Sequence, residues 1–496
     1  MSSKYKVGVV QVYQNGPISN KRLSDDEFFR IRREEVLPQW ETGKDLDNLD
    51  ECIAAAKEIS EGKNYALRIL DAEKRGASLL QPQFGQALTE FMIDGMCHVE
   101  AESPLAPDGL WNVYSDSYTR KVKFDLAQVG IERSRAENAT YLNGWPIVNY
   151  GVEEARRIKK AVQCPMTLNS TDEDGRLASE TALAAGWNAC NCRSLQEVLA
   201  HCKDIPLADE IRINQYESRL AAIYHESGVP QCPHIASNLT GYDSAGFKIF
   251  VMVSQSLMGG EQGLRQICLE NGLNMNMVQD TAMIHTAKKL CEEYTRRFGY
   301  DVHFTSGSFS FLGAWPPRLE EASAMIAWNA TVSLMAGCTQ TILKCQDEAF
   351  ATPTKEGMAS SVRIARHIER LAGSARLTES TEYRTECQML EMEVRAMMDK
   401  TLEAGDGDIA VGLCRGVEAG WISTMLSPWR YNKGNVRLMR DADNAVRYFD
   451  PGDLPLPKEV REYHAEKLKS REKKEGRPLA FDMLVSDLQF VSRLPK

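Results

Sequence analysis

One stretch of the chain predicts both a fold class and the position of a site: Thr341-Ile342-Leu343-Lys344-Cys345-Gln346-Asp347-Glu348-Ala349-Phe350-Ala351-Thr352-Pro353. An apolar β-type run ends in Lys344, Glu348 follows four residues later, and a segment with apolar residues at helical spacing begins after Pro353. In an α/β barrel, side chains at the carboxyl end of such a strand line the active site. A lysine that donates hydrogen bonds beside a glutamate that accepts them suits a ribose diol. The alternative is that both side chains only solvate a rim.

Short β-type segments alternate with helical segments along the middle of the chain. This alternation predicts βαβ units around a parallel sheet, and a span of about 300 residues suits a (β/α)8 barrel with insertions. Nine candidate strands are one more than the barrel needs, so one of them either is not a strand or lies outside the barrel. The candidates are Ser78–Gln81, Trp111–Ser115, Thr140–Leu142, Met166–Leu168, Trp187–Asn191, Pro233–Ala236, Gln266–Leu269, Val302–Thr305 and Thr341–Lys344.

Helical segments flank the predicted barrel on both sides. Ser24 to Glu27 forms a capping box at the start of the first helix. We expect further helices over 49–60, 65–75, 383–404 and from about 458 to 475. The expected α/β architecture is therefore an N-terminal helical extension (1–75), a (β/α)8 TIM-type barrel (76–378) and a C-terminal α+β extension (379–496).

The composition is that of an acidic globular chain. The 496 residues carry a formal net charge of −10, which argues against nucleic acid as the main partner. The start of the chain lacks the apolar core of a signal peptide, and no apolar run approaches the roughly 18 residues of a membrane span. Thirteen scattered cysteines predict reduced thiols in a cytoplasmic protein, and eight histidines without an HExxH pair predict no metal site.

Motifs spread over nearly the whole chain carry a family resemblance. They are Asp26-Glu27-Phe28, Arg33-Glu34-Glu35-Val36-Leu37-x-Gln39-Trp40-x-Thr42-Gly43-Lys44, Asp116-x-Tyr118-Thr119-Arg120, Leu142-Asn143-Gly144-Trp145-Pro146-x-Val148-Asn149, Lys344-x-x-x-Glu348-Ala349, Pro353-Thr354-Lys355-Glu356, Tyr431-Asn432-x-Gly434 and Val446-Arg447-Tyr448. Taken together, these motifs resemble the epsilon (large) subunit of glutamate mutase, also called methylaspartate mutase.

The resemblance implies an isomerase that rearranges the carbon skeleton of a small carboxylate with adenosylcobalamin as cofactor, as the family converts glutamate to 3-methylaspartate. In that family a separate small subunit carries the DxHxxG histidine that ligates cobalt. The segment Asp301-Val302-His303-Phe304-Thr305-Ser306 lacks the glycine at the matching position. The resemblance therefore implies a small cobalamin-binding partner subunit, and a homodimer of this chain within a heterotetramer.

The resemblance also implies which residues meet the adenosyl group. They are Gly85, Asn143, Lys344 and Glu348, with Ala200, Trp315 and Thr352 nearby. A glycine permits close approach of the backbone to a ligand, and the lysine and glutamate would hold the ribose.

The substrate side departs from the family pattern. The family grips its dicarboxylic substrate with three arginines, of which Arg120 is retained, while Gln83 and Asn169 stand at the other two positions. Ser170 follows Asn169 in the same predicted loop. Because charge-assisted hydrogen bonds contribute roughly 1.5–3 kcal/mol each, losing two arginines weakens binding of a second carboxylate. We interpret the departure as a changed substrate with retained radical chemistry.

Three further positions of the substrate side differ from the family. Asn191 stands where the family has the glutamate that handles the substrate amine, and an asparagine cannot act as a base. His201 and Glu197 stand at positions of tyrosine and its neighbour, and either could take over the amine.

Two other hypotheses remain open from the sequence. The chain could be a non-catalytic paralogue that still docks a cobalamin protein, or it could carry out the family's own reaction on glutamate. A third class is an unrelated barrel enzyme in which Lys344 forms a Schiff base with a carbonyl substrate.

Overall fold

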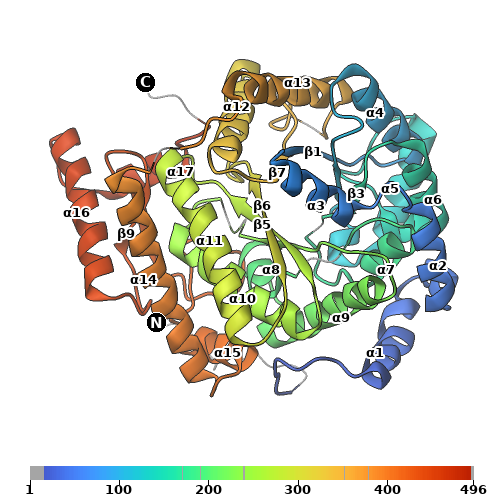
Figure 1. Ribbon diagram of the computed structural model, residues 1–496, viewed down its shortest axis with the longest axis horizontal. Coiled ribbons are helices and arrows are strands. Elements are labelled where there is room, and N and C mark those ends of the chain that lie inside the picture. The colour runs from blue at the N-terminus through green and yellow to red at the C-terminus, as the bar shows by residue number, and fades with distance from the viewer. Residues whose placement is uncertain are drawn as a thin grey trace, which may run out of the picture.

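The computed structural model describes residues 16–169, 171–189, 192–237, 239, 241–350, 352–377 and 379–492. The strands of its larger sheet gather at the centre, with helices around them (Figure 1). Seven parallel strands form one curled sheet in the order β3-β2-β1-β7-β6-β5-β4, which confirms the α/β TIM-type fold. The strands are β1 (Leu79–Phe84), β2 (Trp111–Val113), β3 (Met166–Leu168), β4 (His234–Ala236), β5 (Gln266–Gly272), β6 (His303–Phe309) and β7 (Gln340–Leu343).

The eighth strand position of the barrel is reduced to a single residue among those described. Asn188 bridges β3 by donating its N–H to Met166 O at 3.0 Å and accepting from Leu168 N at 2.8 Å. On its other side, its side-chain amide donates to Cys232 O at 3.0 Å and accepts from Cys232 N at 2.7 Å, just before β4. The Asn188 side chain thus replaces main-chain strand pairing at this position. The sequence predicted a longer strand here, Trp187–Asn191, whose last two residues lie outside the described part.

The surplus strand candidate is Thr140–Leu142, which is a loop between two helices. The prediction was wrong because its β-type side chains are used for packing and capping and not for a ladder. Leu142 is buried in a small apolar cluster, and Thr140 Oγ1 accepts a hydrogen bond from Ala87 N at 3.0 Å. Gly144 then brings the loop against Ser115, where an added Cβ would lie 2.5 Å from the Ser115 backbone.

Helices connect and cover the strands. Thr354 caps one of them, α13, by accepting a hydrogen bond from Gly357 N, as expected for the segment that follows the β7 loop. The connecting helices are α4 (Thr89–Glu102), η4 (Thr119–Lys121), α5 (Phe124–Glu137), α6 (Ile147–Ala161), α7 (Arg176–Ala184), α8 (Ser194–Ala200), α9 (Leu207–Glu226), α10 (Ala245–Glu261), α11 (Met277–Arg297), α12 (Leu319–Met335) and α13 (Lys355–Ala372).

The N-terminal helices are tied to the barrel by a buried ion pair. Arg32 Nε lies 2.9 Å from Glu180 Oε1 on α7, and both side chains are almost fully buried. The predicted helix over 65–75 ends at Gly76, whose φ of 64° suits a glycine. The elements are α1 (Asp25–Ile31), η1 (Arg32–Val36), η2 (Leu37–Gln39), η3 (Glu41–Leu46), α2 (Leu49–Ile59) and α3 (Tyr65–Arg75).

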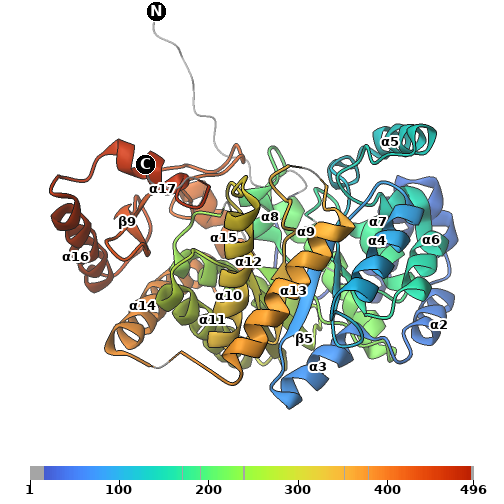
Figure 2. The ribbon, with the colours of Figure 1, turned by 90° about the horizontal axis from the view of Figure 1, so that it is seen from above.

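The C-terminal elements lie on the flank opposite α2 and α6 (Figure 2). Arg447 pairs with Glu386 at 2.7 Å, and Glu386 also accepts from Gln279 of α11, so a buried polar cluster joins the two parts. No helix of the described residues is both long and apolar enough to span a bilayer. The elements are α14 (Thr381–Ala404), α15 (Ile409–Ala419), the antiparallel pair β8 (Arg437–Arg440) and β9 (Val446–Asp450), α16 (Lys458–Glu475) and α17 (Phe481–Leu488).

The bridging role of Asn188 leads to a stability prediction. Asn188→Ala leaves the buried N–H and C=O of Cys232 without their partners and should lower the free energy of unfolding by about 2–4 kcal/mol. Urea unfolding followed by circular dichroism measures the change. Gln128→Ala, at a half-buried amide on α5, is the control and should shift stability by less than about 0.5 kcal/mol. Equal shifts in the two variants would contradict the bridging role.

Candidate active site

A cavity of about 330 Å³ opens at the carboxyl ends of the barrel strands. We call it the mouth cavity. It brings together eight of the residues predicted from the sequence, namely Gln83, Arg120, Asn143, Asn169, His201, Lys344, Glu348 and Thr352. Its remaining lining residues are Tyr114, Thr171, Arg193, Gln196, Glu270, Phe309, Leu312 and Pro353.

Lys344 and Glu348 form one wall of the mouth cavity. Lys344 follows the last residue of β7, and its Nζ lies 2.9 Å from Glu348 Oε1. The same Nζ lies 5.3 Å from the centroid of the Trp315 ring, within range of a cation–π contact. Trp315 is buried, and its Nε1 donates to no described residue. This wall therefore offers donors and an acceptor to a ligand.

Of the other residues expected on this side, Asn143 lines the mouth cavity, whereas Gly85 and Ala200 do not. Asn143 Oδ1 accepts from Ser117 N at 2.9 Å, which orients the loop that carries it. Gly85 lies behind Tyr114, because a Cβ at this position would be 3.0 Å from both the Tyr114 ring and the Gly144 Cα. Ala200 ends α8 directly before His201 and does not itself line the cavity.

Arg120 faces the mouth cavity from the loop after β2. Asp116 shapes this loop by accepting hydrogen bonds from Tyr118 N at 2.8 Å and Thr119 N at 3.2 Å. The Arg120 Nη1 lies 3.5 Å from Thr171 Oγ1, and its buried Nε has no partner among the residues that the structure describes. Among the described residues, no carboxylate lies within 4.0 Å of its guanidinium, so its charge is available to a ligand.

Arg193 and Glu270 form a buried ion pair in the same cavity. Arg193 Nη2 lies 3.4 Å from Glu270 Oε2, and both residues are at most 3% exposed. Burial acts to raise the pKa of Glu270, but the Arg193 charge and hydrogen bonds from His234 and Asn169 outweigh it and hold the pKa below its usual value. Glu270 is therefore a carboxylate whose charge is already compensated.

Asn169 connects the members of this ion pair. Its Nδ2 donates to Glu270 Oε2 at 2.8 Å, and its Oδ1 accepts from Arg193 Nη2. Both ends of the amide are thus bonded within the protein, so Asn169 orients Arg193 as well as lining the cavity.

A chain of hydrogen bonds continues from Glu270 into the barrel. His234 Nδ1 lies 3.0 Å from Glu270 Oε2, and His234 Nε2 lies 2.8 Å from Tyr65 Oη. Tyr65 Oη also accepts from the amides of Gln81 and Gln340 at 2.7 and 2.9 Å. This pattern assigns a hydrogen to Nδ1 of His234 and makes Tyr65 the donor to Nε2. The chain fixes the orientation of the Glu270 carboxylate.

Two titratable groups near the cations are held in their neutral forms. Burial raises the pKa of Glu197 well above its usual value, although Arg193 opposes the shift. Burial and the charges of Arg193, Arg120 and Lys121 lower the pKa of His201 to about 3. At neutral pH, His201 therefore presents an uncharged imidazole to the cavity, and Glu197 lies outside the lining as a buried carboxyl group.

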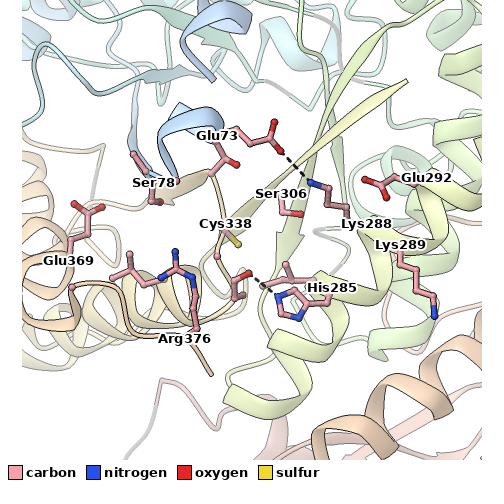
Figure 3. A pocket seen from close by; sticks show the side chains of 18 of the residues that line it. Glu73, Ser78, His285, Lys288, Lys289, Glu292, Ser306, Cys338, Glu369 and Arg376 are labelled. Atoms are coloured by element: carbon pink, nitrogen blue, oxygen red, sulfur yellow. Dashed lines mark hydrogen bonds and ion pairs between the residues drawn. The ribbon is translucent and has the colours of Figure 1, made fainter. Parts of the chain in front are cut away.

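A second cavity of about 650 Å³ lies at the opposite end of the strands (Figure 3). We call it the basal cavity; its lining includes Glu73, Ser78, Lys288, Thr339 and Arg366. Lys288 pairs with Glu73 at 3.3 Å and Arg366 pairs with Glu369 at 2.6 Å, so these cations are compensated within the chain. None of the predicted site residues that the structure describes lines it, and active sites of barrels lie at the carboxyl ends of the strands.

Comparison with known proteins identifies the family. The model of the family described as "Methylaspartate mutase E chain" matches residues 59–494. The chain belongs to the methylaspartate mutase E chain family. It is 34% identical over 477 residues to the glutamate mutase epsilon subunit of Yersinia enterocolitica, covering 96% of this chain and 98% of that protein. It is 32% identical over 480 residues to the protein of the same name from Desulfitobacterium hafniense, with the same coverage of 96% and 98%.

Family membership confirms the resemblance seen in the motifs and the expected enzyme class, an isomerase of the intramolecular transferase type. The near match to a cobalt-ligating motif around His303 falls at the other end of the barrel. His303 begins β6, and its Nε2 pairs with Glu73 at 2.6 Å beside the basal cavity.

Arg193 and Glu270 line the mouth cavity but were not predicted from the sequence. Glu270 directly follows the predicted strand Gln266–Leu269, and Arg193 closely follows the predicted strand Trp187–Asn191. A charged residue at the carboxyl end of a predicted strand is the same signal that singled out Lys344, so both could have been found. Ser170 and Asn191, which were predicted for the substrate side, lie outside the described residues.

The lowered pKa of His201 leads to a prediction about acid stability. The unfolded chain takes up a proton at His201 near pH 6.5, whereas the folded chain does so only near pH 3. The unfolded state therefore binds more protons between these values, and stability falls as pH falls. In His201→Asn, the free energy of unfolding should fall less between pH 7.5 and pH 4.5 than in the unmodified chain. The urea midpoint at each pH measures this difference. His367→Asn, at an exposed histidine of α13, is the control, and an equal change in both variants would contradict the assignment.

Proposed function

We propose that this chain is the large catalytic subunit of an adenosylcobalamin-dependent carbon-skeleton mutase that acts on an amino-acid-like monocarboxylate other than glutamate. Family membership supports the reaction class. One observation carries the substrate proposal. Arg120, Arg193 and Lys344 are the described cations that line the mouth cavity, and only Arg120 lacks a carboxylate partner in the described chain. A single substrate carboxylate would complete this charge balance.

The donor set around Lys344 fits an adenosyl group. The carboxylate of Glu348 can accept from a ribose diol, and Lys344, whose Nζ lies 5.3 Å from the Trp315 ring, can donate. Adenosylcobalamin supplies a carbon radical when its cobalt–carbon bond breaks. Lys344 and Glu348 would hold the ribose at the cavity rim, while Phe309 and Leu312 would keep water from the reacting atoms.

The cobalamin itself would be shared with a second protein. The curated relatives bear the name of an epsilon subunit, which supports a small cobalamin-binding partner for this chain. We further propose a homodimer of this chain within a heterotetramer, located in the cytoplasm.

On the substrate side, we propose that Arg120 holds the carboxylate, because a planar guanidinium matches its two oxygens. Gln83 and Asn169 would face the remainder of the substrate, together with Ser170 and Asn191. The neutral imidazole of His201 can accept a hydrogen bond from an uncharged amine or a hydroxyl. Glu197, which does not line the cavity, would keep its proton as a buried carboxyl group.

The family's own reaction is the second candidate. The relatives are named for glutamate mutase, and conversion of glutamate to 3-methylaspartate would require a second carboxylate to bind beside Arg193 and Glu270. A non-catalytic paralogue would bind cobalamin with its partner but show no hydrogen transfer.

The proposed contacts of Lys344 and Glu348 with the adenosyl group are tested by hydrogen exchange in the complex reconstituted with a small cobalamin subunit. Lys344→Met and Glu348→Gln should each reduce tritium exchange from the adenosyl carbon by about tenfold or more, because each loses a charge-assisted hydrogen bond. Lys355→Met, a change of the same kind at a lysine that begins α13 outside the cavity, is the control. Full exchange in both variants would show that these residues do not contact the adenosyl group.

The substrate proposal is tested by turnover of a panel of amino and hydroxy acids in the same complex. Glutamate should be a poor substrate. Arg120→Lys should lower kcat/KM for the best substrate by about tenfold or more, because the ammonium of lysine cannot donate the two parallel hydrogen bonds that a guanidinium gives a carboxylate. Arg133→Lys, at an exposed arginine of α5, is the control. Efficient conversion of glutamate to 3-methylaspartate would establish the second candidate in place of the first.

A further inference from the structure

Arg193 is a buried cation that lines the mouth cavity. It lies at the start of α8, where Asn214 Oδ1 accepts from Ser194 N at 2.9 Å and so fixes the backbone. Its side chain is 4% exposed, yet it lines the cavity. Such a side chain has little freedom to move away from a ligand.

The charge of Arg193 is compensated before any ligand arrives. Glu270 Oε2 lies 3.4 Å from Arg193 Nη2, and Glu270 also lines the cavity. An anion that approached Arg193 would therefore meet the Glu270 carboxylate as well, and like charges placed side by side oppose binding.

Arg193 still has hydrogen-bonding capacity. Its Nη2 is held by Asn169 and Glu270, whereas no described residue accepts a hydrogen bond from its Nη1. Its Nε is fully buried and is therefore out of reach of a ligand. An uncharged oxygen in the cavity can accept from Nη1 without adding a negative charge.

We propose that Arg193 is a specificity-determining residue of the mouth cavity, which receives an uncharged carbonyl or hydroxyl oxygen of the substrate and, through its pairing with Glu270, disfavours a second carboxylate. This inference rests on the proposed placement of the substrate in the mouth cavity. It adds the chemical class of the group at the end of the substrate away from Arg120.

The test compares two ligands that differ only at that end. Glutarate carries two carboxylates, and glutaramate is its monoamide of the same length. Isothermal titration calorimetry on the full chain without cobalamin should show about tenfold tighter binding of glutaramate. Glu270→Gln keeps the shape of the side chain and an acceptor oxygen but exposes the Arg193 charge, and it should tighten glutarate binding by about tenfold or more.

Two variants separate the charge of Arg193 from other effects. The double variant Arg193→Gln/Glu270→Gln removes both charges and should show no gain for glutarate, as a double-mutant cycle requires. Glu73→Gln makes the same charge change in the basal cavity and should leave both affinities unchanged. Circular dichroism checks that each variant is folded.

Several outcomes would overturn the inference. They are equal binding of the two acids by the unmodified chain, no binding of either acid, an unchanged glutarate affinity in folded Glu270→Gln, or a glutarate gain in the double variant. If Glu270→Gln does not fold, the preference of the unmodified chain and the behaviour of the double variant decide the matter. Because these measurements need no cobalamin, they can fail while the mutase reaction stands, and the reverse also holds.

Discussion

The carboxylate of Glu270 is the interaction on which the mouth of the barrel depends. It comes from β5 and receives hydrogen bonds from Asn169 after β3, from His234 of β4 and from Arg193 before α8. These segments meet where the strand ladder is thinnest, because the position between β3 and β4 is represented by Asn188 alone among the described residues. A buried carboxylate is stable only when it is paired and hydrogen-bonded, so the network holds the rim where main-chain pairing does not.

The charge pattern of the mouth cavity follows from this arrangement. Glu270 compensates Arg193 on one wall and Glu348 compensates Lys344 on the other, while Arg120 faces the cavity without a described partner. Burial, together with the charges of Arg193, Arg120 and Lys121, lowers the pKa of His201 and keeps its imidazole neutral. This pattern supports the proposed binding of one carboxylate at Arg120 and of uncharged polar groups elsewhere.

Residues at the ends of predicted strands could be assigned to the site from the sequence, whereas the side-chain contacts that only the fold creates could not be predicted. Lys344 and Glu348 are four residues apart on one strand and loop, so their spacing alone indicated a shared site. Arg193 and Glu270 are 77 residues apart, and no local pattern shows that their side chains meet. Thr140–Leu142 has the composition of a strand, but its hydrogen bonds and packing depend on Ala87 and Ser115 in distant loops. Asn188 likewise gave no sign that its side-chain amide would replace a strand pair.

The buried pair of Arg193 and Glu270 is better explained by orientation than by stability. Removing two charges from water costs several kcal/mol per ion, and apolar replacements of such pairs are often neutral or stabilising. An apolar wall, however, would leave the planar guanidinium without Asn169 and Glu270 to fix its direction. With Asn169 after β3 and Glu270 of β5 as its partners, Arg193 is held at a defined angle to the cavity, which supports the proposal that it distinguishes an uncharged oxygen from a carboxylate. Stability alone would not require a buried ion pair whose carboxylate is hydrogen-bonded to His234, and His234 in turn to Tyr65.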